Sequence, residues 1–186
     1  MKINFANDRK NKFKIITKRE VLIALVVFCI IFLILCDKPY FAQDFYLFKP
    51  FLWKVSATTT LGYSISAPVI GDESDLNSDK VIIMDITEEA AGYETPKDYV
   101  RARLNEEQSK FEFQWDEVGS FEIGGNQDAY YFIFRPGGEY SGSKNLEVII
   151  KKDEKVYMVS YRSNWRRFDG NYEGALRTIK SFRIKD

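Results

Sequence analysis

The stretch between residues 72 and 79 carries the side chains best suited to bind a metal ion. Carboxylate and amide oxygens at alternate positions are typical of the start of a calcium-binding loop. The candidate calcium ligands are Asp72, Asp75, Asn77 and Asp79. An EF-hand loop also needs a glycine and then a bidentate glutamate, where this sequence has Lys80 and Ile86. The prediction is therefore a solvated surface loop, with calcium as the one cofactor to test.

Arginine and tryptophan cluster ahead of the last predicted helix. The candidate partner-binding residues are Arg162, Trp165, Arg166 and Arg167. Guanidinium groups beside an indole ring suit an acidic protein partner or a lipid headgroup. Both residue types are also common anchors of protein interfaces. The alternative is an exposed start to a helix, with Trp165 half buried.

Histidine and cysteine chemistry is missing from the globular part of the sequence, which leaves only an enzyme that works with carboxylates, hydroxyls and amines as an alternative. The sequence contains no histidine, which excludes histidine-dependent triads, histidine-bearing zinc sites and imidazole proton shuttles. The two cysteines, Cys29 and Cys36, fall in an apolar run, so the globular part has no thiol nucleophile and no internal disulfide. We therefore expect that the protein is not an enzyme.

Charge and hydropathy divide the chain into an arm, an anchor and a domain. Residues 1–20 have a net charge of +5, residues 21–36 are uncharged and strongly apolar, and residues 37–186 have a net charge of −5. As a helix the apolar run spans about 24 Å, somewhat short of a hydrocarbon core of about 30 Å. The positive-inside rule predicts a cytoplasmic arm at 1–20, a transmembrane anchor in the lipid bilayer at 21–36, and a globular domain on the non-cytoplasmic side.

Two other kinds of export signal remain open at this run. Residues 33–36 read Leu-Ile-Leu-Cys and resemble a lipobox, in which Cys36 would carry lipid, although Leu35 is large for that position. A cleaved signal peptide is the other alternative, but no small-x-small cleavage site follows promptly. All three interpretations export the domain.

Residues 37–60 are predicted to be a linker because Pro39, Pro50 and a threonine tract at 58–60 favour an extended chain. Their aromatic residues are dense enough to form a belt at the membrane interface. The members of this predicted belt are Tyr40, Phe41, Phe45, Tyr46, Phe48, Phe51 and Trp53.

The remaining residues, 61–186, alternate between strand and helix signals. Thr95-Pro96 is a capping residue followed by proline, which predicts a helix over 96–109. Apolar residues spaced by four and three from Phe168 to Phe182 predict an amphipathic helix lying on a sheet. Strands are predicted at 63–68, 81–86, 111–115, 120–123, 129–134, 146–151 and 155–161, with a hairpin turn at 124–126.

This order predicts an α+β fold, an antiparallel β-sheet flanked by helices. Three segments, at residues 63–68, 156–161 and 172–182, together resemble the PsbP/Mog1-like domain family over about 62–185. The resemblance implies the sandwich of that family, which includes photosystem II extrinsic proteins, a Ran-binding nuclear factor and bacterial envelope proteins. It transfers no binding residue to this sequence.

The expected function is a membrane-anchored, non-enzymatic extracytoplasmic domain that acts as a docking or assembly module of a membrane complex. The alternative is an envelope ligand-binding or sensory domain with a cleft between sheet and helix. The net negative charge of the globular part argues against nucleic acid as the partner. The sequence identifies neither the partner nor the oligomeric state.

Overall fold

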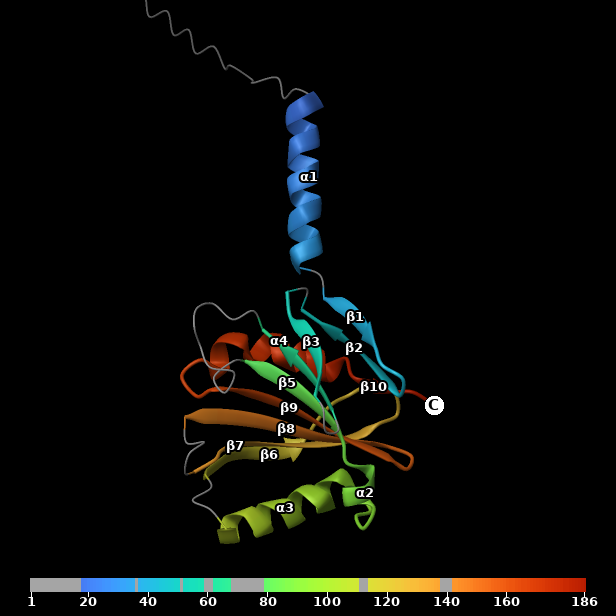
Figure 1. The fold of residues 1–186 in the computed structure, drawn as a ribbon, viewed down its shortest axis with the longest axis vertical. Helices are drawn as coiled ribbons and strands as arrows, with labels where there is room; N and C mark the ends of the chain where they lie inside the picture. Colours follow the sequence, from blue (N-terminus) through green and yellow to red (C-terminus); the bar gives the residue numbers. More distant parts are fainter. Residues whose placement is uncertain are drawn as a thin grey trace, which may run out of the picture. The chain divides into compact units, whose positions relative to one another are not determined.

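The computed structural model describes residues 18–35, 37–50, 52–58, 62–67, 79–110, 114–137 and 142–186. The chain forms two compact units, Met1–Leu35 and Cys36–Asp186. The helices are α1 (Lys18–Leu35), α2 (Thr87–Ala90), α3 (Pro96–Lys110) and α4 (Phe168–Lys180) (Figure 1). The strands are β1 (Lys38–Phe41), β2 (Phe45–Lys49), β3 (Lys54–Thr58), β4 (Gly62–Ser66), β5 (Lys80–Asp85), β6 (Gln114–Ser120), β7 (Asp128–Arg135), β8 (Ser143–Lys152), β9 (Lys155–Asn164) and β10 (Arg183–Ile184).

Helix α1 is apolar on every side after its first turn. The side chains from Val21 to Phe32 are all exposed, and the three residues before them are charged. In the part of the chain that the structure describes, no helix is both long enough and apolar enough to cross a membrane. The apolar part of α1 is only about 22 Å long at 1.5 Å per residue. The predicted transmembrane anchor over 21–36 is thus not shown, and Cys36 lies outside the described residues.

The predicted linker over 37–60 is wrong, because strands β1, β2 and β3 lie in it. Strand β2 pairs with β1 and with β10, and β3 forms one edge of the larger sheet. Phe45, Leu47 and Trp53 are buried in the main core. The predicted aromatic belt is therefore also wrong for Phe45 and Trp53, whereas Phe41 and Phe48 are exposed.

The larger sheet has seven strands in the order β3-β4-β5-β9-β8-β7-β6. All neighbouring strands are antiparallel, as the sequence predicted. The two helices that cover it, α4 and α3, lie on opposite faces (Figure 1). The central strands β8 and β9 are buried on both faces because their side chains alternate between the two helices.

Each face of the sheet has its own hydrophobic cluster. On the α4 face, Phe168, Ala175 and Ile179 pack with inward-facing residues of the sheet and with Phe45 of β2, which confirms the predicted apolar stripe. On the α3 face, a smaller cluster includes Tyr99. Helix α3 begins as predicted: Thr95 Oγ1 accepts a hydrogen bond of 3.2 Å from the Asp98 backbone N–H, and the Thr95 hydroxyl donates to the Asp98 carboxylate.

Several local predictions need correction. The two strands predicted at 111–115 and 120–123 are replaced by the single strand β6, and residues 121–123 form a loop, whereas 111–113 lie outside the described residues. The predicted turn at 124–126 is confirmed, with positive φ angles of 81° at Gly125 and 50° at Asn126. No local pattern predicted the short elements α2 and β10.

Candidate partner-binding site

The ends of four strands meet at one end of the larger sheet. Gln114, which begins β6, pairs in register with Arg135, which ends β7. Ser143, which begins β8, pairs with Asn164, which ends β9. Antiparallel pairing therefore brings Arg135, the neighbouring Lys144 and the turn after β9 to the same end. Loops and strand ends carried by a rigid sheet are common places for binding residues.

The turn between β9 and α4 is fixed by hydrogen bonds to its backbone. The Asn164 side-chain oxygen accepts a bond of 3.0 Å from the Arg166 N–H, and its backbone carbonyl accepts one of 2.9 Å from the Arg167 N–H. The Trp165 N–H donates to the Gly142 carbonyl oxygen at 3.1 Å. A side-chain bond of this kind is typical of an Asx turn. The backbone of Trp165 is thus held in place while its side chain remains 44% exposed.

Two guanidinium groups lie over the Trp165 ring. The Cζ atom of Arg166 is 5.2 Å from the ring centroid, and that of Arg135 is 5.8 Å from it. Exposed cation–π contacts of this length contribute about 0.5–1 kcal/mol each. Lys144 lies beside them, with its Nζ atom 4.9 Å from the Phe168 ring centroid. We call Arg135, Lys144, Trp165 and Arg166 the Arg–Trp surface.

One carboxylate lies against this surface. The register of β6 against β7 shifts between Trp115 and Glu117, so Asp116 is the extra residue of a β-bulge. Its Oδ2 atom is 3.1 Å from the Lys144 Nζ atom and 3.8 Å from an Arg135 Nη atom. Asp116 is therefore a counter-ion shared by two cations of the Arg–Trp surface.

The structure brings together part of the predicted partner-binding set. Trp165 and Arg166 are in contact, and Arg167 is exposed next to them at the start of α4. Arg162 points to the other face of the sheet, the α3 face, where its Nε atom donates to the Asn145 side-chain oxygen at 3.1 Å. Arg162 is thus separated from the site, although it is close in sequence. Its place is taken by residues that the sequence analysis missed, Arg135 and Lys144. Only a correct register for β6 to β9 would have revealed them.

The candidate calcium ligands are only partly described. Asp79 is buried, and its carboxylate accepts hydrogen bonds from the Ser163 hydroxyl and the Asn171 side-chain amide. The other three candidates lie outside the described residues: Asp72, Asp75 and Asn77. Within the described ranges no group of three acidic, histidine or cysteine residues is placed to hold a metal ion. Calcium binding stays a prediction, and Asp79 is engaged with protein donors.

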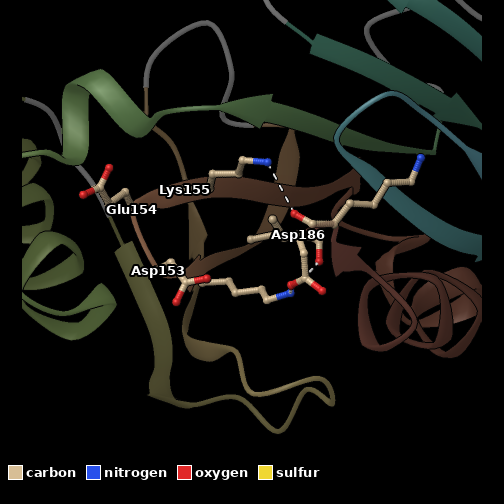
Figure 2. Close-up of a pocket in the computed structure, with 7 residues that line it drawn as sticks. Asp153, Glu154, Lys155 and Asp186 are labelled. Carbon is tan, nitrogen blue, oxygen red and sulfur yellow. Dashed lines mark hydrogen bonds and ion pairs between the residues drawn. The ribbon is translucent and has the colours of Figure 1, made fainter.

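A separate pocket of about 380 Å³ lies where the β8–β9 turn meets the end of the chain (Figure 2). The Lys152 ammonium donates to the Ile184 carbonyl oxygen at 3.2 Å and pairs with Asp186, and this contact lowers the pKa of the Asp186 carboxyl. The Lys155 ammonium donates to the Lys185 carbonyl oxygen at 3.3 Å. These lysines therefore attach the carboxyl-terminal strand to the β8–β9 turn, and each also has an acidic partner, Asp186 for Lys152 and Asp44 for Lys155.

A partly buried ion pair lies on the α3 face. Glu147 of β8 is 8% exposed, and its Oε2 atom is 3.6 Å from an Arg103 Nη atom of α3. Burial alone would lower the pKa of Arg103, but the Glu147 carboxylate raises it and the net shift is upward. The same Nη atom is 3.4 Å from the Met158 sulfur. This pair holds α3 against the sheet, and its guanidinium is occupied.

The fold, rather than the site, has counterparts of known structure. The sheet of seven antiparallel strands with a helix on each face matches solved structures of PsbP-like proteins, so the predicted PsbP/Mog1-like fold is confirmed. Cyanobacterial PsbP (CyanoP) from Synechocystis has 14% sequence identity and a TM-score of 0.57, over 82% of this chain and 94% of that chain. A protein of unknown function from Pseudomonas aeruginosa, PA94, has 13% identity and a TM-score of 0.58, over 81% of this chain and 98% of that chain.

A third counterpart is LpqN of Mycobacterium tuberculosis, described as involved in cell envelope biogenesis. It has 11% identity and a TM-score of 0.56, over 81% of this chain and 91% of that chain. The sequence matches no protein-family model and no curated protein. At these identities the likeness defines the fold alone.

Proposed function

We propose that this chain is a non-enzymatic accessory domain on the non-cytoplasmic side of a membrane, where it docks a protein partner through the Arg–Trp surface. The observation that carries the proposal is the exposed Trp165 side chain, which has two guanidinium groups within about 6 Å of its ring centroid and a backbone fixed by hydrogen bonds. Tryptophan and arginine dominate the binding energy of many protein interfaces. A side chain that is already ordered loses little conformational entropy when a partner binds.

The membrane part of the proposal is supported by α1 and by the charge of the residues before it. An apolar helix with exposed side chains all around favours lipid as its surroundings, and a basic arm of net charge +5 favours the cytoplasmic side. LpqN, one of the structural counterparts, is described as involved in cell envelope biogenesis, which fits an envelope location. A Val27→Asp substitution should weaken retention of the chain in membranes, because a carboxylate at the centre of an apolar helix costs about 3 kcal/mol. Release of the unsubstituted chain from the membrane fraction by an alkaline wash would contradict the anchor.

Site-specific photo-crosslinking in native membranes tests the docking role. A photoreactive amino acid replaces Arg167, which is exposed beside Trp165, and a matched control replaces Tyr93, which is 37% exposed between α2 and α3. We expect a discrete crosslinked product at position 167 and none at position 93. A Trp165→Ala substitution should remove the product. Identical products at both positions, or a product that persists without the tryptophan, would refute docking through this surface.

A further inference from the structure

Resting on the proposed function, we infer that the partner presents a short acidic segment to the Arg–Trp surface, and that Asp116 is the internal counter-ion which this segment displaces. The charges of the described residues support this choice. Residues 37–186 have a net charge of −5, yet the surface brings three cations, Arg135, Lys144 and Arg166, next to one another around Trp165. A local excess of positive charge on a negatively charged domain is complementary to an acidic ligand.

The geometry of Asp116 shows how a carboxylate is bound here. A single Oδ2 atom lies within 4 Å of both the Lys144 ammonium and the Arg135 guanidinium. The β-bulge supplies this residue without using a regular pairing position of β6. The Asp116 side chain is 27% exposed and that of Lys144 is 19% exposed, so the ion pair is partly open to solvent and to a competing charge. A carboxylate from outside can therefore take the same place.

The surface suits a short peptide better than a long polyanion. The guanidinium fork of Arg135 or Arg166 matches a carboxylate, and the Trp165 ring offers an apolar face to neighbouring side chains. A nucleic acid or an anionic bilayer would extend beyond the Arg–Trp surface and meet a domain of net charge −5. A short acidic segment touches only the local cations. We therefore assign the surface to an acidic protein segment.

The inference predicts that Asp116→Asn strengthens binding of an acidic peptide and that Arg135→Gln weakens it. A fluorescently labelled oligoglutamate peptide is titrated with the full-length chain in detergent micelles, and fluorescence anisotropy gives the Kd. Asp116→Asn keeps the shape of the side chain and removes the competing charge, so we expect about two- to fivefold tighter binding. Asp128→Asn, an exposed aspartate at the start of β7, is the matched control and should not change the Kd.

Loss of a surface cation should weaken binding. Arg135→Gln is expected to raise the Kd by about two- to fivefold. Lys97→Gln, which removes an exposed cation of α3 on the other face of the sheet, should leave it unchanged. Binding should also fall as salt increases, because the Debye length decreases from about 10 Å at about 0.1 M to about 3 Å at about 1 M. Circular dichroism confirms that each variant is folded.

Three results would overturn the inference. The first is a Kd for D116N that is unchanged or higher than that of the unsubstituted chain, and the second is an unchanged Kd for R135Q. The third is tighter binding of anionic vesicles or single-stranded DNA than of oligoglutamate, with the same response to Asp116→Asn. The crosslinking experiment separates this failure from that of the proposed function. If any of these results is obtained but the crosslinked product at position 167 still depends on Trp165, the docking role stands and the acidic partner is refuted.

Discussion

Removal of the Asp79 carboxylate should destabilise the domain strongly. Asp79 is 6% exposed just before β5, and its carboxylate accepts hydrogen bonds from Ser163 at the end of β9 and Asn171 of α4. It therefore joins three separate elements. Hydrogen bonds to a charged group contribute about 1.5–3 kcal/mol each. The Asn171 bond is near the surface, and the Ser163 hydroxyl also lies 3.2 Å from the Asn164 carbonyl oxygen, so the lower half of that range applies.

On this basis Asp79→Ala should lower the free energy of unfolding by about 3–4.5 kcal/mol. For a domain of this size the melting temperature then falls by about 6–18 °C. Urea unfolding followed by tryptophan fluorescence measures the effect, with the slope of the transition unchanged. Asp128→Ala is the matched control and should stay within about 0.5 kcal/mol of the unsubstituted chain. A similarly small effect for Asp79→Ala would refute the argument that this carboxylate ties the elements together.

A second substitution at Asp79 tests the predicted calcium loop. Calcium at Asp79 would have to replace the hydrogen bonds from Ser163 and Asn171. We therefore expect calcium to leave the urea midpoint of the unsubstituted chain unchanged. A ligand that binds only the folded state raises its stability by RT ln(1 + [L]/Kd). A calcium-dependent rise that disappears in Asp79→Asn would instead establish Asp79 as a ligand and contradict this expectation.

Three further substitutions test the packing and the pH dependence of the domain. Gly62→Ala should cost about 1–3 kcal/mol because its new methyl group would overlap a backbone carbonyl oxygen of β5, whereas Gly92→Ala meets nothing within 4 Å and should be neutral in urea unfolding. Gln127→Ala should lower the free energy of unfolding by about 2–4 kcal/mol, because the buried Gln127 side chain accepts a 2.6 Å bond from the Ile184 N–H and donates to two carbonyl oxygens. The rate of amide hydrogen exchange at Ile184 should rise in this variant. Burial raises the pKa of Tyr157 to about 12, above the unfolded value of about 10. The protonated phenol therefore contributes fully to folding stability below about pH 10, and this contribution is lost as the pH rises toward about 12. Tyr157→Phe should reduce this alkaline loss of stability, measured as urea midpoints below and above that window.

Local patterns predicted the elements that are stabilised by their own sequence. Helix α4 follows from a stripe of apolar residues that one sheet face covers, and α3 follows from the Thr95 cap. The prediction of a linker over 37–60 failed even though β1 pairs with β2 and β3 pairs with β4, which are neighbours in the sequence. Phe45 and Leu47 alternate like a strand, but the core that buries them comes from distant segments such as α4, and the third strand of their sheet, β10, lies at residues 183–184. Two prolines and a polar tract are the stronger local signal, and they predicted a linker.

The binding site could be predicted only as far as its contiguous part. Trp165 and Arg166 are adjacent in sequence, so their proximity required no knowledge of the fold. Arg135 and Asp116 join them through the register of three antiparallel strand pairs and one bulge, none of which has a local signature. The error at Arg162 has a related cause, because alternate residues of a strand face opposite sides of a sheet. The predicted strand ends at residue 161, whereas β9 continues to Asn164, so Arg162 lies within the strand and not in the turn with Trp165.

The rigidity of the Arg–Trp surface comes from the core beneath it. The Tyr161 hydroxyl, which is buried, donates to the Phe168 carbonyl oxygen at 3.2 Å, at the point where α4 begins. Asn164 fixes the other end of the same turn, so the backbone that carries Trp165 is held on both sides. Burial raises the pKa of Tyr161, so this donor stays protonated at neutral pH. An exposed aromatic side chain on such a turn is positioned before any partner arrives, and this favours binding by charge and shape over binding by folding of the loop.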